Sequence, residues 1–165
     1  MSLLYIREAV GKNGRKIKVP KIRTMCYNAD DRWEELCSMN GRDGLGKIVN
    51  DPRITSLGKI LRKYWIDEIP QLWNVFVKHD MNLVGIRPLN ETYLEAYPED
   101  IREEILRYKP GLIPPTYTRK ADNLDEHLKL IREYFAEKRE HPVKADLKCF
   151  FSVLYNIIFK GMRSR

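Results

Sequence analysis

The stretch that organises this chain is Asp51-Pro52-Arg53-Ile54-Thr55-Ser56-Leu57-Gly58-Lys59-Ile60-Leu61-Arg62-Lys63-Tyr64-Trp65-Ile66-Asp67-Glu68-Ile69-Pro70-Gln71-Leu72. Apolar residues recur at helical spacing in its first part, which predicts a helix over 54–65 with an inward apolar face and an outward basic face. A second helix is predicted to begin near Ile69, because apolar residues recur beyond it and proline is tolerated in a first turn. The adjacent carboxylates Asp67 and Glu68 therefore fall at a helix junction.

The acidic pair has two interpretations. Acidic residues are common in first turns, so Asp67 could cap the second helix and Glu68 could interact with its dipole. Pro70 weakens this interpretation, because it has no N–H to donate to a cap at Asp67. Alternatively, the basic residues just upstream hold a polyanion while a carboxylate attacks it. These basic residues are Arg53, Lys59, Arg62 and Lys63.

Two motifs here resemble the core signature of the bacterial sugar transferases, which are monotopic polyprenyl-phosphate phosphoglycosyl transferases. They are RKYWIDEIPQLWNV over residues 62–75 and DMNLVGIRPL over residues 80–89. The similarity extends to residues 10–14, 21–25 and 109–112, so it covers nearly the whole chain in the right order. Several motifs in register are more specific than any one alone.

The resemblance implies an enzyme that moves a sugar 1-phosphate from a nucleotide sugar of the UDP type to polyprenyl phosphate. This reaction initiates the assembly of exopolysaccharide, capsule, O-antigen or glycoprotein glycan. Asp67 is implied to attack the β-phosphorus, which forms a covalent aspartyl phosphosugar and releases UMP before polyprenyl phosphate attacks in turn. Glu68 is implied as a catalytic orienting residue and Mg²⁺ ligand. The implied contacts to donor phosphate are Lys21, Arg23, Arg62 and Arg87.

Composition bounds the remaining possibilities. With 165 residues, the chain is expected to form a single catalytic domain over 1–165. A net charge of +7 implies anionic partners, namely nucleotide diphosphates, phospholipid headgroups or nucleic acid. The three cysteines, Cys26, Cys37 and Cys149, lack metal-ligand spacing and are interpreted as reduced thiols in a cytosolic compartment.

The expected location is the cytoplasmic face of the inner membrane, peripheral or monotopic. No apolar run reaches the ~18 residues that are needed to span a bilayer. Members of the resembled family normally carry a membrane re-entrant helix before the segment that begins here at Leu3. The chain is therefore expected to be either a shortened form or a naturally anchor-less, soluble relative. Its expected partners are the nucleotide sugar, polyprenyl phosphate and the membrane surface.

The expected fold class is α+β and mainly α. Runs 4–10 and 16–22 favour strands, and Asn13-Gly14 between them predicts a hairpin. Helices are expected to pack around the acidic catalytic junction, and residues 109–117 are expected to be irregular because prolines block a helix there. The predicted helices are 30–39, two within 91–108 that meet near Pro98, and 122–139, whose inward residues are Leu124, Leu128, Ile131, Tyr134 and Phe135.

The C-terminal segment 142–160 is the most apolar part of the chain and has basic flanks. It is expected to form an amphipathic helix that either lies in a membrane interface or packs on the domain core. Asp80 is also open to two roles, as a further metal ligand or as a residue that orders a turn.

Two other function classes are weighed against the transferase. A catalytically silent scaffold derived from it is less favoured, because both acidic residues are present. A basic nucleic-acid-binding module is less favoured still, since no helix-turn-helix, zinc-finger spacing or aromatic RNA-binding signature is found. We therefore expect no nucleic-acid partner.

Overall fold

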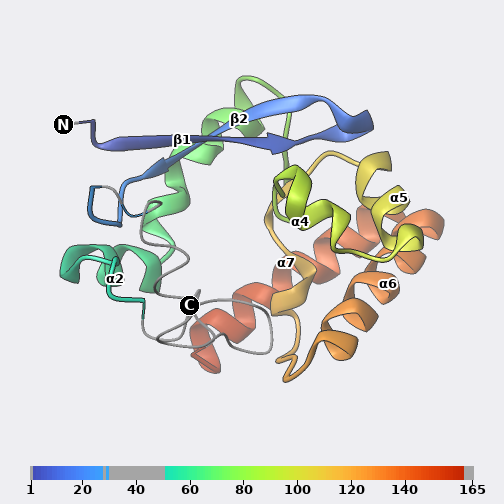
Figure 1. Cartoon of the computed structure of the whole chain (residues 1–165). Coiled ribbons are helices and arrows are strands. Elements are labelled where there is room, and N and C mark those ends of the chain that lie inside the picture. Colours follow the sequence, from blue (N-terminus) through green and yellow to red (C-terminus); the bar gives the residue numbers. More distant parts are fainter. Residues whose placement is uncertain (1, 28, 30–50, 162–165) are drawn as a thin grey trace.

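The computed structural model describes residues 2–27, 29 and 51–161 of the chain. This part is mixed α/β and mainly helical, as expected, with an N-terminal hairpin, a small parallel sheet and the α-helices α2 to α7 (Figure 1). The helix predicted over 30–39 lies outside the described residues, as does Cys37. In chain order the elements are β1 (Leu4–Val10), η1 (Lys12–Gly14), β2 (Lys16–Ile22), α2 (Ser56–Lys63), η2 (Ile66–Gln71), α3 (Leu72–Phe76), β3 (Asn82–Val84), α4 (Glu91–Glu95), α5 (Glu99–Arg107), β4 (Gly111–Ile113), η3 (Pro115–Tyr117), α6 (Leu124–Glu140) and α7 (Pro142–Phe159).

The predicted N-terminal hairpin is confirmed. Strands β1 and β2 pair antiparallel, with Val10 opposite Lys16 next to the turn. Asn13 and Gly14 have φ angles of 56° and 75°, in the left-handed region that these two residue types tolerate best. The inner face of the hairpin packs on Met81 through Ala9, Ile17 and Val19.

The apolar face of α2 was expected to turn inward, and this prediction is wrong in part: Ile54, Leu61 and Trp65 are partly buried, but the rest of the face is not. The side chains of Leu57, Ile60 and Tyr64 are each more than half exposed. The face that carries Gly58 packs inward instead, and Gly58 is buried. A Cβ at this position would lie 2.1 Å from the carbonyl oxygen of Thr24. The glycine allows a close backbone approach that points the apolar stripe outward.

The acidic junction is a 3-10 helix rather than the start of an α-helix. The second helix was expected to begin near Ile69, but η2 begins earlier, at Ile66, and α3 follows only from Leu72. Asp67 is not the cap: Trp65 occupies that position with a left-handed φ of 60° and no capping side chain. Pro70 lies inside η2, and its missing N–H removes one donor from the α-helical pattern.

The prediction of an irregular segment over 109–117 is wrong in part. Strand β4 pairs in parallel with β3, and the 3-10 turn η3 follows it. Pro110 and Pro114 flank β4, so they limit its length without removing a needed donor from its interior. Gly111 is required for the pairing, because a Cβ there would lie 2.1 Å from the backbone nitrogen of Gly85.

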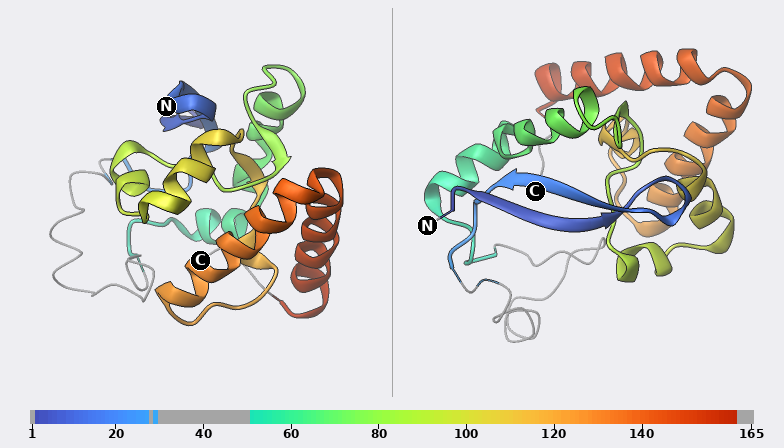
Figure 2. Two further views of the ribbon diagram at one scale, coloured as in Figure 1. Left: turned by 90° about the vertical axis from the view of Figure 1, so that its right-hand side faces the viewer. Right: turned by 90° about the horizontal axis from the view of Figure 1, so that it is seen from above.

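The main core lies between β3, α5, α6 and α7 (Figure 2). The two helices predicted on either side of Pro98 are confirmed as α4 and α5, and α6 matches the helix predicted over 122–139. Leu124 was expected to face inward, but it is exposed, because it is the first residue of α6 and precedes the packed turns. The core residues are Val84, Ile86, Ile101, Leu128, Ile131, Tyr134, Phe135, Ala145, Cys149 and Val153.

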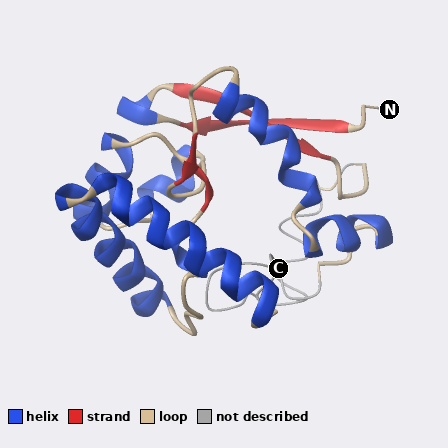
Figure 3. Cartoon of the chain, turned by 180° about the vertical axis from the view of Figure 1, so that it is seen from behind, coloured by secondary structure: helices blue, strands red, loops and turns tan. Residues whose placement is uncertain are grey.

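Helix α7 packs on the core on one side and carries apolar side chains on the other. Seen from behind, it crosses the near face of the molecule (Figure 3). Within the ranges given above, no helix combines the length and the hydropathy that crossing a bilayer requires. The exposed apolar residues of α7 are Val143, Leu147, Phe151, Leu154, Tyr155, Ile158 and Phe159.

Candidate active site

Glu68 is the centre of a buried charge cluster. Its side chain is 4% exposed, and its Oε1 accepts a hydrogen bond from Lys21 Nζ at 3.0 Å. Arg87 Nη2 lies 3.3 Å from both carboxylate oxygens. Burial opposes ionisation of Glu68, but Arg87, Lys21 and Arg7 outweigh it and lower its pKa below the ordinary value. Glu68 is therefore a stable carboxylate with two cationic partners from distant segments.

Asp67 lies in a different environment from its neighbour. It is 6% exposed and has neither a hydrogen bond nor an ion pair with any residue that the structure describes. Burial and the negative charge of Glu68 raise its pKa, and Lys21, Arg62 and Arg87 offset part of this effect. A carboxylate without a hydrogen-bond partner keeps its lone pairs available, which is what a nucleophile needs.

Arg87 lies beside a pair of aromatic rings. Its Cζ lies 5.0 Å from the ring centroid of Trp65 and 5.5 Å from that of Tyr117. The two rings contact each other edge to face, with their centroids 4.9 Å apart. The left-handed backbone of Trp65 is costly for a residue with a side chain, and such conformations cluster at functional sites.

Arg7 belongs to this cluster, although the sequence reasoning missed it. Its Nη2 donates to the carbonyl oxygen of Pro88 at 2.6 Å, next to Arg87. Burial lowers the pKa of Arg7, whereas Glu68 raises it and Arg87 lowers it further. The available signal was strand periodicity, because Arg7 lies two residues from the buried Ala9 and therefore on the same face of β1.

The remaining candidate cations differ in position. Arg62 Nε donates to Thr24 Oγ1 at 2.9 Å. Burial lowers the pKa of Arg62, and the negative charge of Asp67 is the largest effect that raises it. Arg23 instead lies over the rings of Tyr5 and Tyr27, at 5.6 and 5.7 Å. The structure thus brings Lys21, Arg62 and Arg87 to the acidic pair, whereas Arg23 makes no contact with either carboxylate in the part of the chain described.

The two adjacent carboxylates at this junction are oxygen donors, which are compatible with Mg²⁺. No group of three or more His, Cys, Asp or Glu side chains suited to a metal occurs among residues 2–27, 29 and 51–161. Mg²⁺ is commonly held by one or two carboxylates together with substrate phosphates and water. A carboxylate has about four lone-pair positions, so Glu68 retains acceptor capacity beside Lys21 and Arg87.

Asp80 has a bracing role in the structure. Its Oδ1 accepts from Asn74 Nδ2 at 2.9 Å, and the same amide donates to the carbonyl oxygen of Lys18 at 2.9 Å. Asn74 is fully buried. These contacts tie the turn after α3 to the hairpin, as the turn-ordering interpretation of Asp80 predicts.

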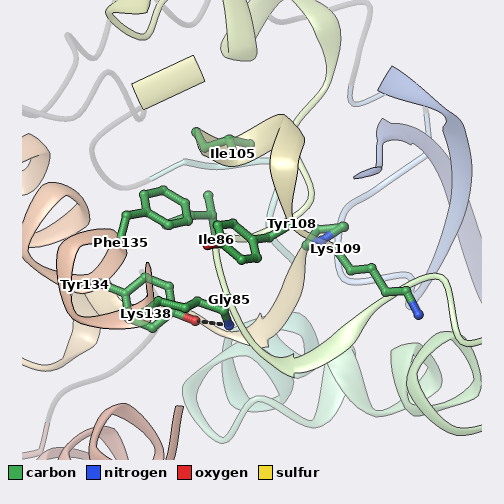
Figure 4. A pocket seen from close by; sticks show the side chains of 9 residues that line it. Gly85, Ile86, Ile105, Tyr108, Lys109, Tyr134, Phe135 and Lys138 are labelled. Atoms are coloured by element: carbon green, nitrogen blue, oxygen red, sulfur yellow. Dashed lines mark hydrogen bonds between the residues drawn. The ribbon is translucent and has the colours of Figure 1, made fainter. Parts of the chain in front are cut away.

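A second polar cluster lies in the helical core. Lys138 Nζ donates to Tyr134 Oη at 2.8 Å and to Asp146 Oδ1 at 2.6 Å, which connects α6 to α7. The adjoining cavity is lined by Gly85, Tyr108 and Phe135, among others (Figure 4). Its volume of ≈ 10 Å³ leaves room for about one water molecule, so it excludes a nucleotide sugar. This cluster serves helix packing.

Known proteins are similar to this chain over nearly its whole length. The bacterial sugar transferase family matches residues 1–160. The chain is 42% identical over 114 residues to a UDP-galactose-lipid carrier transferase of Erwinia amylovora, an alignment that covers 66% of this chain and 24% of that protein. It is 37% identical over 138 residues to galactosyl transferase CpsE of Streptococcus agalactiae, covering 81% and 30%.

A third relative is aligned over more of the chain. It is the UDP-N-acetylgalactosamine-undecaprenyl-phosphate N-acetylgalactosaminephosphotransferase of Aeromonas hydrophila, 29% identical over 169 residues, with 98% of this chain and 35% of that protein covered. The chain therefore spans between 24% and 35% of the length of these three relatives.

Proposed function

The chain belongs to the bacterial sugar transferase family, and from this premise we propose that it transfers a sugar 1-phosphate from a UDP-sugar to undecaprenyl phosphate. This reaction would start the synthesis of a polysaccharide. The names of the relatives support the donor and acceptor classes. The observation that carries the proposal is the contrast between Asp67, which has no described hydrogen-bond partner, and Glu68, which is paired with Lys21 and Arg87.

In the first step we propose, a carboxylate oxygen of Asp67 attacks the β-phosphorus of the UDP-sugar. A bond forms between this oxygen and phosphorus, and the bond to the bridging oxygen of the diphosphate breaks, so UMP leaves with the electron pair. An aspartyl phosphosugar remains on the protein. A phosphate oxygen of undecaprenyl phosphate then attacks the same phosphorus and displaces Asp67, which regenerates the carboxylate.

Surrounding cations are needed because a carboxylate attacks an anionic diphosphate. Arg87 and Lys21, which both contact Glu68, would offset the repulsion and hold the phosphoryl oxygens, and Arg62 would add positive charge near Asp67. Arg23 would reach the donor only through a change of orientation from its contacts with Tyr5 and Tyr27. We therefore rank Arg23 below the other three as a phosphate contact.

Mg²⁺ is the cofactor that we propose for this site. When bound, it would neutralise charge on the diphosphate and favour departure of UMP. Glu68 is the side chain proposed to hold it, because it remains ionised and retains free lone pairs. Arg87 and Lys21 would keep the Glu68 carboxylate in one orientation.

We also propose that the exposed apolar face of α7 contacts the membrane surface on which the lipid acceptor resides. Residues Lys144 and Lys148 near the start of α7 and Lys160 at its end are cationic, which suits anionic headgroups. Further exposed apolar side chains are Ile69 of η2 and Trp73 and Phe76 of α3. Packing of α7 on the core and contact with a membrane are thus compatible.

The test is intact-mass spectrometry after incubation with Mg²⁺ and a panel of UDP-sugars, combined with an assay for UMP. We expect the protein to gain the mass of one sugar phosphate and to release UMP. Asp67→Asn should abolish both. Asp122→Asn is the matched control, because the side chain of Asp122 is exposed and pairs only with the surface residue Lys120 among the contacts described. Absence of an adduct and of UMP with every donor, in detergent and in nanodiscs, would refute transfer and indicate a silent scaffold.

A further inference from the structure

Asn156 is a buried polar residue near the C-terminal end of the apolar inner face of α7. Its side chain is 3% exposed, and it follows Ala145, Cys149 and Val153 along the inner side of α7. Burying an amide costs free energy unless its hydrogen bonds are made. Asn156 Nδ2 makes two, donating to the carbonyl oxygens of Tyr117 at 3.0 Å and Thr118 at 2.6 Å. These bonds join α7 to the end of η3.

The segment that Asn156 holds leads directly to the candidate active site. Tyr117 has its backbone carbonyl bound to Asn156, and its ring contacts both Trp65 and the guanidinium of Arg87. On the other side of this guanidinium, Nη2 contacts Glu68. A continuous chain of contacts therefore runs from Asn156 through Tyr117 and Arg87 to Glu68.

Asn156 is suited to positioning because its two bonds go to the backbone. Hydrogen bonds from one amide group to two successive carbonyls restrict both the place and the tilt of the turn, and hence the direction in which Tyr117 projects. The ring of Tyr117 is one of the two that contact the Arg87 guanidinium. Arg87 contributes only if it points at the phosphoryl group, and a misplacement of about 1 Å can cost on the order of a hundredfold in rate.

We propose that Asn156 is a positioning residue, which orients Arg87 toward the donor phosphate by fixing the backbone of Tyr117. The proposal rests on the proposed function for its effect on rate. The structural part of the proposal, which is that Asn156 fixes the contact between Tyr117, Trp65 and Arg87, is independent of that function.

The first readout is the indole resonance of Trp65 in the ¹H–¹⁵N spectrum of the full chain, assigned by its loss in Trp65→Phe. Asn156→Asp is the test variant, because it keeps the shape of the side chain and replaces both donors by an acceptor that faces two carbonyls. We expect the Trp65 resonance to move, since Tyr117 changes its position over the indole. Val153→Ala is the control: Val153 is also buried on α7 but has no hydrogen bond to the η3 turn. It should lower stability and leave the resonance in place.

The second readout is UMP release. Asn156→Asp should lower kcat on the order of tenfold or more while KM changes by less than about threefold, because an arginine that acts on the transition state is displaced. Asn156→Gln keeps the two donors on a longer side chain, so its kcat should lie between those of the wild type and Asn156→Asp. If Asn156→Asp does not fold, Asn156→Gln is the test variant. Combined with Tyr117→Ala, Asn156→Asp should have little additional effect, because both act through one ring.

Three results for Asn156→Asp would overturn the proposal. They are a Trp65 resonance that does not move, a kcat equal to that of Val153→Ala, and an effect on kcat that is fully additive with that of Tyr117→Ala. If the wild-type protein releases no UMP, the proposed function fails, but the resonance still decides whether Asn156 positions Tyr117.

Discussion

The carboxyl groups of Asp67 and Glu68 belong to adjacent residues, yet their pKa values are shifted in opposite directions. Burial and the charge of Glu68 raise the pKa of Asp67. Burial also acts to raise the pKa of Glu68, but Arg87, Lys21 and Arg7 lower it by more, so the net shift is downward. The 3-10 geometry of η2 allows this division, because it directs two consecutive side chains into different surroundings. One carboxylate is stabilised as an anion and its neighbour is not.

Asp67→Asn is expected to stabilise the fold at neutral pH, by on the order of 1 kcal/mol, because a buried anion without a described hydrogen-bond partner is removed. The native state holds the Asp67 proton more tightly than the unfolded chain, so stability falls as pH rises from the ordinary aspartate pKa through the raised native value. The gain from the substitution should therefore be present at about pH 7 and absent near pH 4. Urea unfolding at both values measures it; a loss of stability at neutral pH would contradict the prediction.

Glu68→Gln should have the opposite effect and destabilise the protein at neutral pH by roughly 1–3 kcal/mol, because Lys21 and Arg87 lose their counter-charge. The lowered pKa of Glu68 means that its contribution is present above the unfolded pKa and is lost as pH falls through the native value. Glu137→Gln, which breaks a surface pair with Lys148, should cost no more than about 0.5 kcal/mol. Equal costs for the two variants would rule out a special role for the buried cluster.

The rate of adduct formation should rise with pH as Asp67 loses its proton, with a midpoint above the ordinary aspartate range. The reason is that only the carboxylate form is a nucleophile. Single-turnover measurements with a UDP-sugar over acidic to neutral pH give the midpoint. A rate that does not depend on pH across this range would show that the ionisation of Asp67 does not limit the step.

Arg7→Gln should reduce the rate of UMP release by on the order of tenfold, because the turn at Pro88 that carries Arg87 loses its hydrogen bond from β1. Arg7→Lys keeps the charge and loses the guanidinium geometry, so its activity should also fall, by a smaller factor. Arg15→Gln is the control on the same hairpin, because Arg15 is exposed at its end. If Arg7→Gln and Arg15→Gln behave alike, Arg7 does not support the site.

Gly58→Ala should destabilise the protein by about 1–3 kcal/mol, although alanine favours a helix by about 1 kcal/mol over glycine. The new Cβ would lie 2.1 Å from the carbonyl oxygen of Thr24, and α2 would have to move away from it. The difference between Lys59→Ala and Lys59→Gly, at the exposed neighbouring position, reports the propensity effect alone. If Gly58→Ala stabilises the protein by that same difference, the contact with Thr24 yields easily.

Sequence reasoning was successful where the signal is local. The hairpin follows from Asn13-Gly14, whose backbone preferences decide the turn without help from distant residues. The break near Pro98 is similarly local. The position of Asp67 and Glu68 at a junction was also predictable, because proline and the change of apolar spacing both occur there.

What escaped the sequence depends on contacts between distant segments. The outward face of α2 is set by the approach of Gly58 to Thr24, and apolar spacing alone cannot reveal which partner a helix meets. The strand at 111–113 exists because it pairs with 82–84, although the prolines around it favour a loop. Arg7 lies in an ordinary strand pattern, and only the fold places it beside Pro88.

Helix α7 has two faces with different surroundings, and this arrangement has a thermodynamic consequence. Through Asn156, the inner face holds the turn that carries Tyr117, while the outer face is apolar and open. If contact at the outer face shifts α7 and thereby changes the affinity for the donor, then donor binding must change the affinity of the outer face for its contact by the same factor. Binding to a surface and binding of the donor would then be thermodynamically linked, so a change in one affinity could be measured through the other.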